Sequence, residues 1–189
     1  MKKEIITITG TLGSGKSSTA DLVAKKLEFN RFSSGDFMRK IALESEISLN
    51  DLNKKAEHSI EIDKKIDDAV KEAGKQEKIV IDSRLAFHWI PNSFKVYLDL
   101  PPEIAQNRIL NNLKENPLRK QSEDSITREE IYKKIISRRE SEIKRYKDLY
   151  GIDNYTDKNN FDLIIDTNKN NLEQVVEIIV SEYKKWLND

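Results

Sequence analysis

Four residues near the amino terminus have types and spacing suited to binding phosphate. Gly10, Gly15, Lys16 and Ser17 match the pattern G-x-x-x-x-G-K-[ST] within the stretch GTLGSGKSS. Glycines allow the backbone to turn its amide hydrogens toward phosphate oxygens, and a helix that begins near Lys16 adds the positive end of its dipole. The lysine can neutralise β and γ phosphates, and the serine hydroxyl can ligate Mg²⁺. We therefore expect nucleotide phosphates to be bound by Gly10, Gly13, Ser14, Gly15, Lys16, Ser17 and Ser18.

The same pattern also occurs by chance, so its neighbours matter. The apolar run from Ile5 to Ile8 precedes it as a strand would, and a helical pattern follows it. This context favours a phosphate-binding loop over an accidental glycine turn. For Ser14 and Ser18 the simpler interpretation, capping or solvent-facing hydroxyls, stays open.

A carboxylate near the metal is expected from Asp82, which ends the apolar run Ile79-Val-Ile-Asp82. If this strand lies beside the one that precedes the glycine loop, Asp82 emerges close to Ser17 and can hold Mg²⁺ through water. The alternative is a strand-ending aspartate that caps the next helix.

The segment Ser33-Ser-Gly-Asp-Phe-Met-Arg39 offers a second anion site. Gly35 allows a tight turn, Asp36 can cap the helix that follows, and Arg39 lies one turn later. A guanidinium there can bind a phosphate through two parallel hydrogen bonds. A capped helix with a surface arginine is the alternative.

Arginine is used sparingly and is concentrated in one region. The chain has 24 lysines and 9 arginines, so lysine carries its general surface charge. Concentrated arginine fits a clamp over a triphosphate and a transferring phosphoryl group. On a helix over residues 127–146, Arg138 and Arg145 share a face while Arg139 lies about 100° round from Arg138. For at least one of Arg138 and Arg139, an ordinary role as a solvated or ion-paired residue therefore stays open as an alternative. Six arginines fall between residues 108 and 145: Arg108, Arg119, Arg128, Arg138, Arg139 and Arg145.

These residues need a scaffold, and the chain offers one in which short strands alternate with helices. Strands are expected over residues 5–9, 79–82, 95–100 and 161–166, with 31–33 a weaker candidate. Helices are expected over 16–27, 36–44, 49–74, 102–113, 127–146 and 172–186, and Thr127 with Glu130 forms a capping-box pattern. The alternation predicts a doubly wound α/β fold with ligands at the carboxyl ends of the strands. Residues 49–74 and the polar stretch 111–126 are candidates for moving parts.

Composition limits the class of protein. At 189 residues the chain suits a single domain. Its 33 basic and 33 acidic residues give a net charge of zero, which argues against general binding to nucleic acid or to an anionic membrane. The chain has no cysteine, so disulfides and cysteine-ligated metals are excluded. Because no apolar segment approaches about 18 residues, we expect a cytoplasmic protein that does not enter a membrane.

The chain resembles the cytidylate kinase-like group of nucleoside monophosphate kinases, most closely its shorter, archaeal-type members. The resemblance rests on motifs that occur in order along most of the chain: ITITGTLGSGKSS, FSSGDFMRKIA, AEHSIEID with KKIDDAV, VIDSRLA, and RRESEIKRYKDLYGID with FDLIIDT. It implies transfer of the γ-phosphoryl group of ATP, with Mg²⁺, to CMP or dCMP. It also implies a three-layer P-loop NTPase fold with a five-stranded parallel sheet of order 2-3-1-4-5. Residues 1–189 would form one kinase domain, in which about 36–74 bind the acceptor and about 111–138 form a lid.

The resemblance also implies roles for residues outside the glycine loop. Ser34, Gly35, Asp36 and Arg39 would face the acceptor nucleotide, and Arg84 would contact its phosphate or base.

Lys16, Arg139 and Arg145 are the implied catalytic residues, with the two arginines bridging the donor and acceptor phosphates. Asp63 and Asp67 match acidic positions of the acceptor region, where a ribose or base contact and a solvated acidic helix face are both open. Two features depart from the group. The loop reads GSGKS rather than the GSGTT type common in the archaeal branch, and the expected lid lacks an arginine often found there.

Two alternatives differ in chemistry from a cytidylate kinase. The chain could be a kinase of the same fold for another nucleoside monophosphate or small acceptor, or an ATP-gated binding protein without catalysis. A dedicated base is not required for the kinase interpretation, since phosphoryl transfer depends mainly on positioning and charge stabilisation. In the kinase interpretation we expect a monomer whose partners are small nucleotides, and we expect residues 87–91, including His88, to be core and loop.

Overall fold

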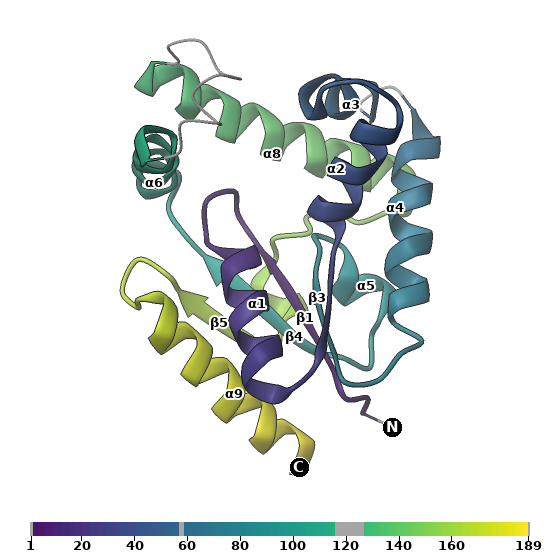
Figure 1. The fold of residues 1–189 in the computed structure, drawn as a ribbon, viewed down its shortest axis with the longest axis vertical. Coiled ribbons are helices and arrows are strands. Elements are labelled where there is room, and N and C mark those ends of the chain that lie inside the picture. Colours follow the sequence, from purple (N-terminus) through teal and green to yellow (C-terminus); the bar gives the residue numbers. More distant parts are fainter. Residues whose placement is uncertain (1, 57–58, 116–126, 189) are drawn as a thin grey trace.

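The computed structural model describes residues 2–56, 59–115 and 127–188, and its centre is a parallel sheet (Figure 1). The five strands have the order β2-β3-β1-β4-β5. This arrangement confirms the predicted fold class and strand order. The strands are β1 (Ile5–Gly10), β2 (Asn30–Ser33), β3 (Ile79–Asp82), β4 (Phe94–Asp99) and β5 (Leu163–Asp166).

Helices cover both faces of the sheet and make the three layers (Figure 1). Alternate residues of each strand point to opposite faces, so Ile6 and Ile8 pack against α1 (Lys16–Leu27) and α9 (Leu172–Asn188). Ile5 and its neighbours in β3 pack instead against α4 (Ile60–Ala73) and α5 (Ala86–Trp89). Every residue of β1 is buried, because a parallel sheet between two helical layers has no solvated face.

The remaining helices surround the carboxyl ends of the strands. They are α2 (Ser34–Glu44), α3 (Leu49–Ala56), α6 (Pro102–Glu115) and the long α8 (Arg128–Tyr150), and a short 3₁₀ turn η1 (Lys158–Asn160) precedes β5. Figure 1 shows α8 running above the sheet edge from α6 to α4. The predicted capping box is present at the start of α8, where Thr127 and Glu130 bond reciprocally.

Several boundaries differ from the predicted ones. The stretch predicted as helical over 49–74 is two helices, α3 and α4, and α4 begins anew after Ser59, whose backbone is extended. Helix α2 begins two residues earlier than predicted because Ser33 is its N-cap: the Ser33 hydroxyl accepts from the amide of Asp36. The prediction that Asp36 caps this helix was therefore wrong.

Two further differences concern the expected loop and lid. Residues 87–91 are not simply core and loop, since Ala86–Trp89 form α5. Of the expected lid, 111–115 continue α6 and 128–138 belong to α8, while 116–126, with Arg119, lie outside the described residues. Across residues 2–56, 59–115 and 127–188, no helix combines the length and apolarity needed to cross a membrane.

The strand register brings three chain segments to one edge. Asp82 pairs in register with Ile8 of β1 on one side and with Ser33 of β2 on the other. The end of β3 therefore lies between the glycine loop that follows β1 and the helix α2 that follows β2. This convergence is the reason why residues far apart in sequence share one site.

Candidate active site at the carboxyl edge of the sheet

The glycine loop connects β1 to α1 with the geometry that its sequence predicts. Gly15 has φ 85°, in the left-handed region that favours glycine, and it is the N-cap of α1. A Cβ atom on Gly10 would lie 2.5 Å from the carbonyl oxygen of Leu98, so β4 passes too close for any side chain there. The loop backbone and the first turn of α1 thus form a compact cradle for an anion.

Lys16 folds back over this loop. Its Nζ donates to the carbonyl oxygens of Gly10 and Thr11, both at 2.9 Å. Burial lowers the pKa of Lys16 to about 8; the charge of Arg84 adds to the lowering, and Asp82 opposes it. A phosphate beside this ammonium would favour its charged form.

Ser17 and Asp82 meet as predicted. The Ser17 hydroxyl donates to Asp82 Oδ2 at 2.7 Å, and the Ser33 hydroxyl lies 3.3 Å from the same oxygen. The N-cap of the following helix α5 is Leu85 and has no side-chain cap hydrogen bond, so the alternative of Asp82 as a helix cap was wrong. Arg31, which was not among the predicted site residues, places its guanidinium 3.7 Å from Asp82.

The Ser17–Asp82 pair fits Mg²⁺ in its donor chemistry. Hydroxyl and carboxylate oxygens are hard ligands, and Mg²⁺ commonly binds one or two carboxylates together with substrate phosphates and water. In the described part of the chain, no group of three or more His, Asp or Glu side chains could hold a metal ion. Phosphate oxygens and water would therefore complete the coordination.

On the acceptor side, Asp36 lies between two arginines. Its carboxylate accepts from Arg31 at 2.9 Å and also from Arg39. Burial raises the pKa of Asp36, but the hydrogen bond and charge of Arg39 lower it by more. The pKa of Asp36 is therefore below its ordinary value. Arg39 is 53% exposed, which leaves its outer side accessible to a ligand. The Ser34 hydroxyl, by contrast, points inward and donates to the carbonyl oxygen of Asp82 at 3.3 Å.

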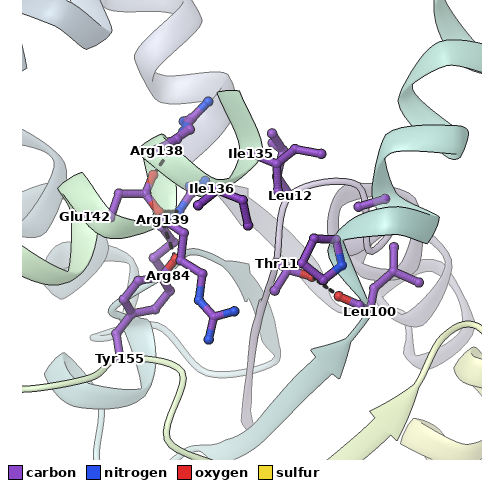
Figure 2. A pocket seen from close by; sticks show the side chains of 12 residues that line it. Thr11, Leu12, Arg84, Leu100, Ile135, Ile136, Arg138, Arg139, Glu142 and Tyr155 are labelled. Carbon is purple, nitrogen blue, oxygen red and sulfur yellow. Dashed lines mark hydrogen bonds and ion pairs between the residues drawn. The ribbon is translucent and has the colours of Figure 1, made fainter. Parts of the chain in front are cut away.

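A cleft separates the glycine loop from α8 (Figure 2). Figure 2 shows Thr11, Leu12 and Leu100 on one side of it and the charged side chains on the other. Its twelve lining residues are Thr11, Leu12, Arg84, Leu100, Pro102, Ala105, Ile135, Ile136, Arg138, Arg139, Glu142 and Tyr155. One wall thus comes from the loop and α6, and the other from α8, Arg84 and Tyr155.

Glu142 organises the charged wall and was missed by the sequence reasoning. This carboxylate is 5% exposed and accepts from Arg84 at 2.6 Å, from Arg138 at 3.0 Å and from Tyr155 at 2.8 Å. Burial raises the pKa of Glu142, but the two arginines lower it by more, so the carboxyl stays ionised. The one available signal was the spacing of Arg138 and Glu142, four apart on a helix.

Arg139 is held differently from Arg138. Its NH2 group donates to the hydroxyl of Thr156 at 3.0 Å. Arg138 is 41% exposed and ion-paired with Glu142. This agrees with the expectation that one of these two adjacent arginines would be an ordinary ion-paired residue.

Arg145 is ion-paired with Asp63 of α4 at 2.9 Å and does not line the cleft described above. Asp63 and Asp67 are 5% and 6% exposed, so the alternative of a solvated acidic helix face was wrong. Both oxygens of Asp67 are used within the protein: Oδ1 accepts from Trp89 at 2.9 Å and Oδ2 from Tyr150. The structure therefore brings Arg145 and the two aspartates to the contact between α4 and α8.

The predicted serines lie in the glycine loop and the first turn of α1, whereas His88 belongs to α5. Ser14 is 2% exposed and its hydroxyl has no partner, while Ser17 and Ser18 are exposed. His88 is exposed and packs its ring against Trp89 at 4.6 Å between centroids.

Comparisons with known proteins agree with this geometry. Residues 6–133 match the family described as the AAA domain. The chain is 35% identical over 176 residues to the cytidylate kinase of Pyrococcus abyssi, a match that covers 93% of this chain and 91% of that protein. It is also 33% identical over 185 residues to the S-adenosylmethionine-dependent nucleotide dehydratase of Lacinutrix mariniflava, covering 97% of this chain and 36% of that longer protein.

A solved structure supports the fold alone. The shikimate kinase of Bacteroides thetaiotaomicron superposes with a TM-score of 0.67 at 14% identity, over 95% of this chain and 98% of that one. The sequence match to this cytidylate kinase extends over nearly all of both proteins. The chain belongs to the cytidylate kinase family of P-loop proteins and is, with that family, a phosphotransferase.

Proposed function

We propose that the protein is a nucleoside monophosphate kinase that transfers the γ-phosphoryl group of ATP to CMP or dCMP. The observation that carries the proposal is the cleft in which the glycine loop faces Arg84 and Arg139. A donor triphosphate and an acceptor monophosphate repel each other, so bringing them together requires cationic groups on both sides. The cytidylate kinases that align with nearly the whole chain support cytidine as the acceptor base.

The donor half of the site comprises the glycine loop, Lys16, Ser17 and Asp82. In this proposal, loop amides hold the β phosphate, and Lys16 exchanges its two carbonyl contacts for phosphate oxygens. Ser17 and Asp82 would hold Mg²⁺, which when bound supplies charge neutralisation of the triphosphate.

The acceptor half comprises the start of α2 together with Arg84. Arg39 is the exposed cation of that helix turn and would bind the monophosphate through its planar fork. Asp36, held between Arg31 and Arg39, fits a supporting role for Arg39 at least as well as a direct contact with the nucleotide. Arg84 follows β3 by two residues and lines the cleft, where it would meet phosphate from either nucleotide.

The chemistry is an in-line displacement. An oxygen of the acceptor phosphate forms a bond to the γ phosphorus while the bond to the β,γ-bridging oxygen breaks, and ADP leaves with that electron pair. Lys16, Arg139 and Arg145 are the proposed cations for the charge on the transferring group. Residues about 36–74 and about 111–138 are the proposed acceptor-binding and lid segments of one kinase domain, and closure would exclude water.

An acceptor panel tests this proposal. Purified protein with Mg-ATP is given CMP, dCMP, UMP, AMP or dTMP, and ADP release is followed. We expect turnover with CMP or dCMP and little with the others. Turnover confined to AMP, UMP or dTMP would refute the cytidylate assignment, and ATP binding without any transfer would favour an ATP-gated binding protein.

Lys16→Ala and Lys26→Ala make a matched pair for the donor site. Both lysines lie in α1, but Lys26 is at its far end, ion-paired with Glu177. We expect Lys16→Ala to reduce kcat by about 100-fold or more, since it removes a cation beside the transferring group, and Lys26→Ala to leave kcat unchanged. Similar losses in both variants would contradict the assignment of Lys16.

The remaining parts of the proposal concern the oligomeric state and the cellular location of the protein. We infer a cytoplasmic monomer that uses small nucleotides as partners, and sedimentation of the purified chain tests the oligomeric state against its mass of 22.0 kDa.

A further inference from the structure

The turn that follows α8 contacts the charged wall of the cleft through two consecutive side chains. Tyr155 and Thr156 are 3% and 6% exposed, although they belong to a loop. Tyr155 donates to Glu142, and Thr156 accepts from Arg139. The turn thus reaches two of the residues that line the cleft.

The hydrogen bonds of Thr156 have a defined direction. Its hydroxyl is 2.7 Å from Asn154 Oδ1, and its amide donates to the same oxygen at 3.0 Å. A guanidinium can only donate, so the Thr156 oxygen accepts from Arg139 and its single hydrogen goes to Asn154.

Arg139 keeps its full positive charge because its partner, the Thr156 hydroxyl, is neutral. Arg39, Arg138 and Arg145 each form an ion pair with a carboxylate, as does Arg84. Among the residues that the structure describes, Arg139 has no ion pair. Its guanidinium is therefore oriented by a hydrogen bond without being neutralised, and it lines the cleft in which the proposed function would bring the phosphates together.

We propose that Thr156 is a positioning residue for phosphoryl transfer, acting through Arg139. Thr156 holds one edge of the guanidinium and leaves the other donors and the full charge for the transferring group. The inference rests on the proposed function and deepens it. Because charge stabilisation is effective only with fixed donors, loss of the Thr156 hydroxyl lowers kcat more than it changes KM.

The test uses a substitution that keeps the shape of the side chain. Thr156→Val removes the hydroxyl, and Thr156→Ser restores it. We expect Thr156→Val to reduce kcat by about tenfold with KM for ATP and acceptor changed less than about twofold, and Thr156→Ser to recover most of the loss. Thr7→Val is the matched control. Thr7 is also buried, and its hydroxyl forms a hydrogen bond of 3.0 Å with Ser93, which does not line the cleft.

A double-mutant cycle separates positioning from general stability. If Thr156 acts through Arg139, Thr156→Val has no further effect on kcat in an Arg139→Ala background. A structural role would instead lower the unfolding temperature, leave kcat normal below it and give additive effects. Additive losses of kcat, or failure of Thr156→Ser to restore kcat, overturn the inference.

The outcome remains distinguishable from failure of the proposed function. If the wild-type protein transfers phosphate to none of the acceptors, the proposed function fails. The orientation of Arg139 is then followed without turnover, through the ¹⁵N NMR signal of its guanidinium in the wild-type, Thr156→Val and Thr156→Ser proteins. A signal that shifts or broadens in Thr156→Val and returns in Thr156→Ser supports the positioning role, and a signal unchanged in Thr156→Val overturns it.

Discussion

Glu142 is a single buried carboxylate that serves two guanidinium groups and a phenol. Two cations on one anion leave a net positive charge on the cleft wall, which suits an anionic ligand. Removal of one member of such a buried cluster leaves uncompensated charge, so its members depend on one another. This residue accounts for why Arg84, although only 19% exposed, remains fixed and charged at the cleft.

The first prediction for a single residue concerns Asp82. We expect Asp82→Asn to lower kcat by about 10- to 100-fold and to raise the Mg²⁺ concentration needed for half-maximal rate, because the amide binds metal-bound water less well than a carboxylate. Steady-state rates across a Mg²⁺ titration provide the measurement. Asp99→Asn is the control, since Asp99 also ends a strand but pairs with Lys158. An unchanged Mg²⁺ dependence in Asp82→Asn would contradict the metal assignment.

Among the helices, the contact between α4 and α8 joins the acceptor region to the arginine-bearing helix. Arg145 pairs with Asp63, and Tyr150 bonds Asp67, which also binds Trp89 of α5. Three helices are therefore fixed to one another behind the cleft. For Arg145 to reach phosphate, as the family resemblance implies, it would have to leave Asp63 or bridge to the ligand while keeping that pair.

Asp63 gives a prediction about pH. Burial raises its pKa from 3.8 to about 6, with Asp67 and Glu142 adding to the rise and Arg145 opposing it. The folded state therefore binds the proton more tightly than the unfolded state, and the contribution of Asp63 to the unfolding free energy falls as pH rises from 3.8 to about 6. We expect Asp63→Asn to remove this fall in urea unfolding measured across that range.

Carboxyl ¹³C NMR checks the same group directly. Arg145→Met should move the titration midpoint of Asp63 above 6, because it removes the opposing positive charge. Lys147→Met, on the same helix but paired with Asp153, should leave the midpoint in place. A midpoint near 4 in the wild-type protein would show that Asp63 is not desolvated.

For the whole molecule, the decisive property is that one cleft would receive both nucleotides. An adenosine and a cytidine joined by five phosphates should then stabilise the protein more than ATP or CMP alone at equal concentration. At about 100 times its Kd, such a ligand adds about 2.7 kcal/mol, or about 5–10 °C in Tm for a chain of this size. Thermal unfolding with the three ligands is the measurement. The analogue with two adenosines tests base selectivity, and a shift no larger than that with ATP would argue against adjacent sites.

The accuracy of the sequence-based predictions depended on how local each feature was. The loop from Gly10 to Ser17 and the capping box of Thr127 could be predicted, since each depends on residues a few positions apart. The role of Asp36 as a cap was mispredicted because Ser33, three residues earlier, already starts the helix and accepts from the amide of Asp36. Asp63 and Asp67 look like a solvated face in sequence, because their partners come from α8 and α5.

Periodicity and local turn chemistry were enough to predict the succession of strands and helices, the phosphate loop and the placement of Asp82 at a strand end. The partners of Arg84 and Arg139, by contrast, depend on tertiary contacts between distant parts of the chain. Arg84 donates to Glu142, 58 residues away in the chain. Arg139 donates to Thr156, 17 residues away. Such pairs depend on how α8 crosses the sheet edge, and no spacing within one helix specifies that crossing.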